Sequence, residues 1–259
     1  MIYKYKDLKI NYEIFEKEKS SKHPPLLLLH GWMANIQAMI PIFKYFSETR
    51  KVIVLDFPGQ GGKSDTLKEV WGVPEYSEMV KCFIEDQNII GSDVIAHSFG
   101  GRVTIYLASK YQTLFNRIIL TDSAGILPKK SLKARLKLIS YKFLKSFYKI
   151  IMSKEKYENK LKQMREKRSS IDYKALDSDI MRETFKKIVN LNLKENLKYI
   201  KNSTLIVWGE NDKDTPIYMA KIMEKEIKDS GLVILENAGH FSYIDNTQKY
   251  LLVANEFLK

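Results

Sequence analysis

The sequence contains little that could build a metal cluster or a covalent cross-link. Its 259 residues include a single cysteine, Cys82, which excludes an internal disulfide and a cysteine-cluster metal site. Four histidines make a multi-histidine site hard to build, so we expect neither a metal nor a cofactor. No apolar run approaches the roughly 18 residues that a membrane helix needs. The N-terminus also lacks the apolar segment of a secretory signal, so we expect a soluble, cytoplasmic protein.

Positive charge is concentrated in one internal stretch. Between Lys129 and Ser170 there are 15 Lys and Arg residues and three Glu, an excess of 12 that equals the net charge of the whole chain. This imbalance indicates a separate structural unit. A solvated helical face is the simplest interpretation, and weak association with an anionic membrane surface is the alternative. No recognition motif accompanies the charge, so we expect no nucleic acid binding.

Short apolar runs alternate with helical patterns along most of the chain. Residues 2–5 and 9–15 alternate polar and apolar side chains and predict an antiparallel hairpin. Later runs lack this alternation, which is typical of strands buried on both faces of a parallel sheet. These runs are Leu26–His30, Val52–Asp56, Asp93–Ala96, Arg117–Thr121, Leu205–Trp208 and Leu232–Leu235.

Helical patterns fill the intervals between the runs, at residues 36–47, 77–88, 101–111, 216–228 and 247–258. Strands and helices that alternate after an antiparallel start predict an α/β fold. We expect a mostly parallel sheet with helices on both faces.

One connection is far longer than the crossover of about a dozen residues that a parallel sheet needs. We predict that residues 126–201 form a helical cap inserted into one core domain, made of residues 1–125 and 202–259. A helical wheel of this segment places apolar side chains opposite lysines. The apolar residues are the candidates for substrate binding: Leu144, Phe147, Tyr148 and Ile151.

The strongest chemical signal is a serine between a predicted strand and a predicted helix. Ser98 stands in the segment AHSFGG, directly after the run that ends at Ala96. A serine at such a sharp turn is held in a strained backbone conformation that exposes its hydroxyl. Ala96 and Gly100 are small enough to let the strand and helix backbones approach. We therefore predict that Ser98 is a nucleophile rather than an ordinary helix cap.

A serine nucleophile needs a base, and the base needs an orienting carboxylate. His240 follows the last predicted strand, whereas His97 neighbours the serine and is expected to point to the opposite side. Asp212 follows the preceding strand, with Asp214 and Glu210 as alternatives. Because functional groups gather at the carboxyl ends of strands in open α/β sheets, we predict that serine, imidazole and carboxylate meet there.

The negative oxygen that forms when serine attacks a carbonyl needs hydrogen-bond donors. Phe99, the residue after the nucleophile, offers one backbone N–H. Trp32 lies in the turn after the first parallel strand and offers a second, while Gly31 lets this backbone approach closely. We predict an oxyanion hole formed by these two N–H groups.

These segments together resemble the α/β-hydrolase superfamily, in the capped branch that includes carboxylesterases and carbon–carbon bond hydrolases. The order nucleophile, acid, base along the chain is that of this family. The resemblance implies the α/β-hydrolase fold, catalytic roles for Ser98, Asp212 and His240, and oxyanion N–H groups from Trp32 and Phe99. An alanine at 96 replaces the usual first glycine of the elbow. The matching segments are His30–Trp32, Asp56–Ser64, Ala96–Gly101, Trp208–Pro216 and Ala238–Phe241.

The residues and the resemblance predict a serine hydrolase that cleaves a small or medium carboxylic ester through an acyl-enzyme intermediate. Its partner would be a small-molecule ester or a related acyl compound. A carbon–carbon bond hydrolase, a thioesterase or an acyltransferase of the same fold would share all of these residues. Outside the enzymes, a ligand sensor or regulatory binding protein could retain the triad with little turnover.

Overall fold

The computed structural model describes residues 1–17, 22–128, 176 and 178–259. The chain divides into two compact units, one made of Met1–Leu127 with Glu183–Lys259 and the other of Pro128–Arg182. The four candidate substrate-binding residues lie outside the described residues: Leu144, Phe147, Tyr148 and Ile151. Residues 183–201, assigned above to the cap, belong to the first unit. The cap itself stays a prediction, and the following paragraphs concern the first unit.

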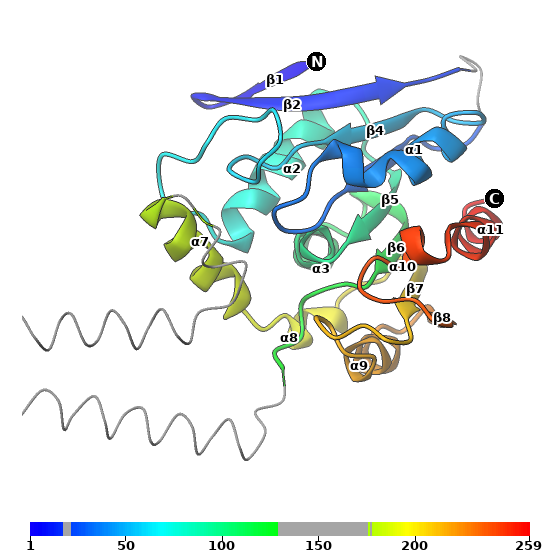
Figure 1. Cartoon of the computed structure of the whole chain (residues 1–259). Coiled ribbons are helices and arrows are strands. Elements are labelled where there is room, and N and C mark those ends of the chain that lie inside the picture. Colours follow the sequence, from blue (N-terminus) through cyan, green and yellow to red (C-terminus); the bar gives the residue numbers. More distant parts are fainter. Residues whose placement is uncertain (18–21, 129–175, 177) are drawn as a thin grey trace, which may run out of the picture. The chain divides into compact units, whose positions relative to one another are not determined.

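The first unit contains an eight-stranded sheet with the strand order β1-β2-β4-β3-β5-β6-β7-β8. Strand β2 is antiparallel to both of its neighbours, and every other pair is parallel. The predicted opening hairpin and the six later strands are therefore confirmed (Figure 1). The strands are β1 (Ile2–Tyr5), β2 (Leu8–Phe15), β3 (Leu26–Leu29), β4 (Val52–Leu55), β5 (Ser92–His97), β6 (Phe115–Thr121), β7 (Thr204–Gly209) and β8 (Ser230–Leu235).

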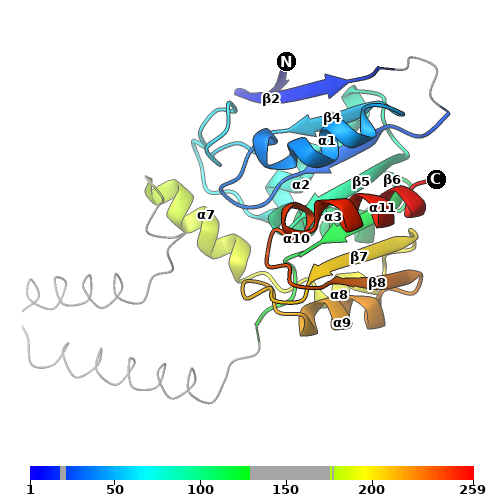
Figure 2. The same cartoon turned by 45° about the vertical axis from the view of Figure 1, so that its right-hand side comes forward.

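Helices cover both faces of this sheet, as predicted. Helices α1, α10 and α11 contact one another on one face, and α2, α3, α8 and α9 pack in that order on the other (Figure 2). Their bounds are η1 (Ile36–Met39), α1 (Ile40–Phe46), α2 (Val73–Asp86), α3 (Phe99–Lys110), α8 (Lys194–Leu197), α9 (Tyr218–Glu226), α10 (Ser242–Asp245) and α11 (Thr247–Phe257). Helix α7 (Asp179–Val189) crosses the division between the two units. In the described part of the chain, every helix is too short or too polar to cross a membrane.

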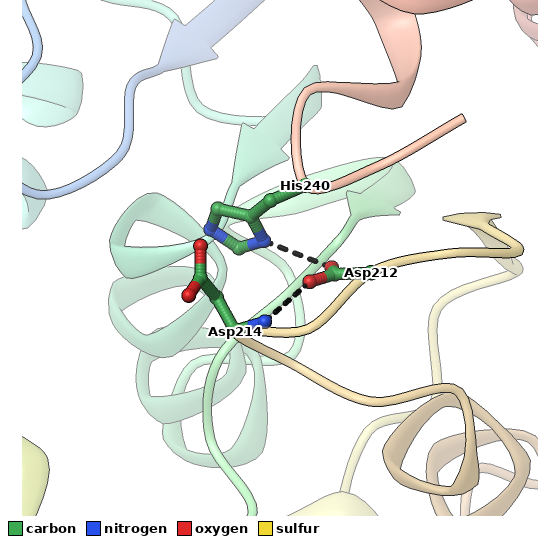
Figure 3. Close-up of side chains that lie close together, drawn as sticks. All are labelled: Asp212, Asp214 and His240. Carbon is green, nitrogen blue, oxygen red and sulfur yellow. Dashed lines mark hydrogen bonds and ion pairs between the residues drawn. The ribbon is translucent and has the colours of Figure 1, made fainter.

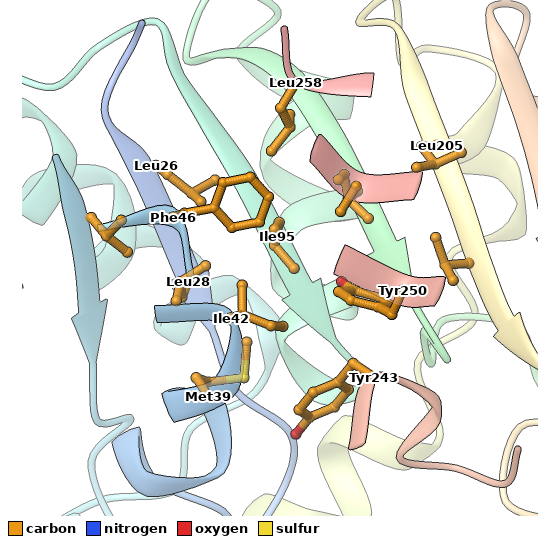
Figure 4. Close-up of a cluster of buried hydrophobic side chains, with 14 of the residues drawn as sticks. Leu26, Leu28, Met39, Ile42, Phe46, Ile95, Leu205, Tyr243, Tyr250 and Leu258 are labelled. Carbon is orange, nitrogen blue, oxygen red and sulfur yellow. The ribbon is translucent and has the colours of Figure 1, made fainter. Parts of the chain in front are cut away.

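A hydrophobic core lies between the sheet and helices α1 and α11, which cover one of its faces. Side chains of the central strands, such as Leu28 and Ile95, meet Phe46 of α1 and Tyr250 of α11 (Figure 4). All four are buried, and each such side chain contributes roughly 1.5–3 kcal/mol when it leaves water. This packing fixes the strand ends from which the site loops emerge.

Two elements differ from their sequence predictions. Helix α2 begins at Val73 rather than at Ser77, because the N–H of Gly72 donates to the Glu75 carboxylate (2.6 Å) and Pro74 occupies the first turn. Strand β8 is not buried on both faces, and Ile234 is 36% exposed. It lies at one edge of the sheet, and the composition of a strand alone does not show whether it is an edge strand or a central strand.

Candidate active site

Ser98 occupies the turn between β5 and α3 in a backbone conformation that side-chain-bearing residues rarely adopt. Its φ is 47° and its ψ is −105°. The turn is held from the neighbouring strand, because the Ser98 N–H donates to the Thr121 carbonyl (3.1 Å) and the Ala124 N–H donates to the Ser98 carbonyl (3.0 Å). Such strain persists only where the surroundings enforce it, and here it presents the hydroxyl at the carboxyl end of the sheet.

The small residue after the elbow is required by the approach of a neighbouring backbone. The N–H of Gly100 donates to the His30 carbonyl (3.1 Å). A Cβ built on Gly100 would collide with the backbone carbonyl oxygen of Leu29, the last residue of strand β3. The preceding small position, Ala96, is fully buried, so its methyl group fits where the usual pattern has glycine.

The structure brings the three predicted side chains within hydrogen-bond distance of one another. The Ser98 hydroxyl lies 3.0 Å from Nε2 of His240, and Nδ1 of His240 lies 2.8 Å from Oδ2 of Asp212. The alternative carboxylates make other contacts. The backbone N–H of Asp214 donates to Oδ1 of Asp212 (2.8 Å), and the Glu210 carboxylate accepts the N–H of Asn237 (3.1 Å). The geometry therefore favours Asp212 as the partner of the imidazole (Figure 3).

The carboxylate of Asp212 is held by its own loop. Its Oδ1 accepts the N–H of Thr215 (2.9 Å), and its Oδ2 accepts the Thr215 hydroxyl (2.6 Å). Burial alone would raise the pKa of Asp212, but the hydrogen bonds from His240 and Thr215 outweigh it and lower this pKa. Burial would likewise lower the pKa of His240, yet the bond to Asp212 and its charge raise it. Each partner therefore stabilises the charged form of the other.

Two buried residues support these loops and were not predicted from the sequence. Nε2 of His97 donates to the backbone carbonyl of His240 (2.7 Å), so its ring does face the base. The carboxylate of Asp122, directly after β6, accepts the N–H groups of Gly209 (2.8 Å) and Ser242 (3.0 Å). His97 is the last residue of β5 and Asp122 directly follows β6. A position at the carboxyl end of a central strand was the sequence signal available for both residues.

Of the predicted oxyanion residues, Phe99 directly follows the serine and Trp32 lies in the turn after β3. Within the described part of the chain, the backbone N–H groups of Trp32 and Phe99 have no protein acceptor. Their rings contact edge to face, with centroids 5.5 Å apart. Buried His30 fixes the Trp32 turn, since its Nδ1 donates to the Gly31 carbonyl (2.8 Å) and its Nε2 accepts the Phe57 N–H (2.9 Å). Two backbone donors without an acceptor among the described residues would suit a negative oxygen.

One group of described residues has spacing that a metal ion could use. Asp212, Asp214 and His240 each offer a ligand atom, all within 4.8 Å of one another (Figure 3). The hydrogen bond between Asp212 and His240 already accounts for the closeness of those two side chains. Asp214 is an exposed neighbour, so the arrangement does not itself point to an ion.

Comparison with known proteins places the chain in a family. A family model described as alpha/beta hydrolase fold matches residues 24–162, and one described as TAP-like protein matches residues 186–255. Monoacylglycerol lipase ABHD6 of Mus musculus is 25% identical over 255 residues, which cover 91% of this chain and 75% of that protein. Lipase 1 of Psychrobacter immobilis is 26% identical over 234 residues, covering 85% of this chain and 72% of that protein.

The solved structure of the enol-lactonase from Burkholderia xenovorans LB400 superposes with a TM-score of 0.76 at 16% identity, covering 100% of this chain and 99% of that one. At this identity the likeness concerns the fold. The first family model spans more than half of the sequence. The chain therefore belongs to the alpha/beta hydrolase family and is a hydrolase.

Proposed function

We propose that this hydrolase cleaves a small or medium carboxylic ester, with Ser98 as nucleophile, His240 as base and Asp212 as the orienting acid. The observation that carries the proposal is the continuous contact from hydroxyl to imidazole to carboxylate, at 3.0 Å and 2.8 Å. Relatives named monoacylglycerol lipase and Lipase 1 support a carboxylic ester as the substrate class.

In the first half of the proposed reaction, the Ser98 oxygen attacks the ester carbonyl carbon while its proton passes to Nε2 of His240. The carboxylate of Asp212 keeps the proton on Nδ1 and stabilises the imidazolium. The N–H groups of Trp32 and Phe99 take up the negative charge on the former carbonyl oxygen. One such donor is typically worth about 3–4 kcal/mol. The tetrahedral species then collapses, and the alcohol leaves with the proton from Nε2.

In the second half, water replaces the alcohol. His240 takes a proton from water, the resulting nucleophile attacks the acyl-serine carbonyl, and the acid product leaves as the Ser98 oxygen regains its proton. A carbon–carbon bond hydrolase, a thioesterase or an acyltransferase would share the same residues. These alternatives differ in the leaving or accepting group, so a thioester, a carbon–carbon substrate and an acyl acceptor have to be offered beside the ester panel below to distinguish them.

A fluorophosphonate probe and a panel of p-nitrophenyl esters of increasing chain length test the proposal. Wild-type protein should be labelled once, at Ser98, and should hydrolyse the shorter esters. Ser98→Ala should lose labelling and lower kcat on the order of 10⁶-fold. Ser109→Ala removes the hydroxyl of a serine near the end of α3 and should behave as wild type. Unchanged turnover in Ser98→Ala would reject this assignment, and an inert wild type would favour a binding protein.

A weak association with an anionic membrane surface is part of the proposal and rests on sequence alone. The excess of positive charge lies between Lys129 and Ser170, within residues that the structure does not describe. Sedimentation with phosphatidylserine-containing vesicles should retain more protein than sedimentation with neutral vesicles, and the difference should fade at high salt. Equal partition onto both would count against the association. The cytoplasmic location also stays a prediction.

A further inference from the structure

Asp122 is a fully buried carboxylate that the proposed mechanism does not use. It follows β6 with a φ of 44°, in the left-handed region, and its side chain is 0% exposed. Burying an unpaired carboxylate is costly, and burial raises the pKa of Asp122 to about 7. A group retained at this cost calls for a specific interaction. Its two oxygens supply one, because each accepts a backbone N–H from a different loop.

The two N–H groups flank the loops that carry the acid and the base. Oδ1 of Asp122 accepts from Gly209 (2.8 Å), the residue at which β7 ends and the Asp212 loop begins. Oδ2 accepts from Ser242 (3.0 Å), two residues after His240. Because the two oxygens of one carboxylate are rigidly spaced, this side chain sets the distance between the two loops.

A further contact joins the Asp122 backbone to the acid itself. The Thr215 hydroxyl lies within hydrogen-bond distance of both the Asp122 carbonyl oxygen (3.1 Å) and Oδ2 of Asp212 (2.6 Å). A shift of the Asp122 backbone would therefore reach the Asp212 carboxylate through one side chain. The ionisable groups whose charges interact with Asp122 are Asp212, His240, Tyr243 and Tyr250.

We propose that Asp122 is a positioning residue that fixes the acid-bearing loop against the base-bearing loop and so aligns Asp212 with His240. The inference rests on the proposed function, since it assigns a supporting role to the proposed triad. Its carboxylate touches neither substrate nor the Ser98 hydroxyl in the mechanism above. Misplacement of catalytic groups by about 1 Å can cost about 100-fold in rate, so a residue of this kind can matter without taking part in chemistry.

The test compares Asp122→Ala and Asp122→Asn with a matched variant at Asp93. Asp93 is also buried, accepts the Arg117 N–H (3.0 Å) and pairs with Arg50 (2.9 Å), but it lies at the opposite end of β5 from Ser98. Asp93→Asn should lower the melting temperature and leave the kcat of the folded protein unchanged. Asp122→Ala should lower kcat about 100-fold with KM changed less than about twofold.

Asp122→Asn should lose less activity, about tenfold, because its amide oxygen still accepts one N–H while its NH₂ faces the other. A second readout does not depend on turnover. The His240 Nδ1 proton, shared with Asp212, should give a downfield proton resonance in wild type and in Asp93→Asn. This signal should weaken or move in both Asp122 variants.

Wild-type kcat and an unshifted resonance in folded Asp122→Asn would overturn the inference, even if its melting temperature falls. Should Asp122→Ala fail to fold, Asp122→Asn decides. Ser98→Ala is measured alongside to separate the two proposals. Activity that survives in Ser98→Ala rejects the proposed triad, whereas an inactive Ser98→Ala with fully active Asp122 variants rejects only the positioning role.

Discussion

Nε2 of His97 lies 2.7 Å from the backbone carbonyl oxygen of His240, so the residue before the serine holds the backbone of the proposed base. Burial, helped by the nearby His240 charge, lowers the pKa of His97 to about 3. The ring is therefore neutral at ordinary pH, with its proton on the nitrogen that faces the carbonyl. Its centroid lies 5.0 Å from that of the His240 ring, which adds a packing contact to the hydrogen bond.

Replacing His97 should separate these two contributions. His97→Phe keeps a ring against Phe241 and Tyr243 but removes the donor, and we expect kcat to fall about tenfold. His97→Gln offers an amide N–H to the same oxygen and should retain more activity. Steady-state kinetics on a p-nitrophenyl ester checks the order. A more active Phe variant would show that ring packing, not the hydrogen bond, is what His97 supplies.

The pH dependence of kcat/KM should report the environment of His240. The bond to Asp212 and its charge outweigh burial and raise the pKa of this imidazole above 6.5. Below its pKa, Nε2 is protonated and cannot accept the Ser98 proton. We therefore expect kcat/KM to fall as the pH drops through a midpoint above 6.5, in a titration from about pH 5 to about pH 9. A midpoint below that value would contradict the ion pair.

Two nearby carboxylates provide a matched pair of variants. Asp212→Asn should lower kcat by about 10⁴-fold, because the imidazole loses the partner that fixes its proton on Nδ1. Asp214→Asn removes an exposed charge that makes no hydrogen bond to the ring among the described residues, and we expect a loss smaller than about tenfold. Similar losses in both variants would mean that Asp214 can substitute for Asp212.

The close approach at the elbow predicts a stability difference between two glycines. Gly100→Ala forces a methyl group against the Leu29 carbonyl oxygen and should cost about 1–3 kcal/mol of unfolding free energy. Gly231→Ala adds a methyl group with no neighbour within 4 Å and should stay within about 0.5 kcal/mol of wild type. Denaturant titration measures both. Equal stabilities would show that the β3 backbone can yield at this turn.

The sequence predicted the sheet well because its strands are short, apolar and separated by helical patterns. It did not predict α10 (Ser242–Asp245), whose four residues carry no periodic signal. It also missed that β8 is an edge strand, since strand order depends on pairings between distant segments. Cys82 is half-buried on α2, where its thiol lies 3.8 Å from the Glu78 carboxylate.

The proposed triad was predictable because each member has a distinctive position at a strand end, although chain order left Asp214 and Glu210 as alternatives to Asp212. His97 and Asp122 were missed for a physical reason. Each acts through a hydrogen bond to the backbone of a residue more than 80 positions away, and no local pattern encodes such a contact.

The Ser98 hydroxyl and its imidazole partner are 142 residues apart in the chain. During synthesis the residues of the serine turn leave the ribosome long before the loop after β8, so an unfinished chain holds a serine with no base beside it. Reactivity toward acyl compounds would then switch on only when the last loop docks against the sheet. The onset of labelling by an active-site probe during translation would time the closing step of folding.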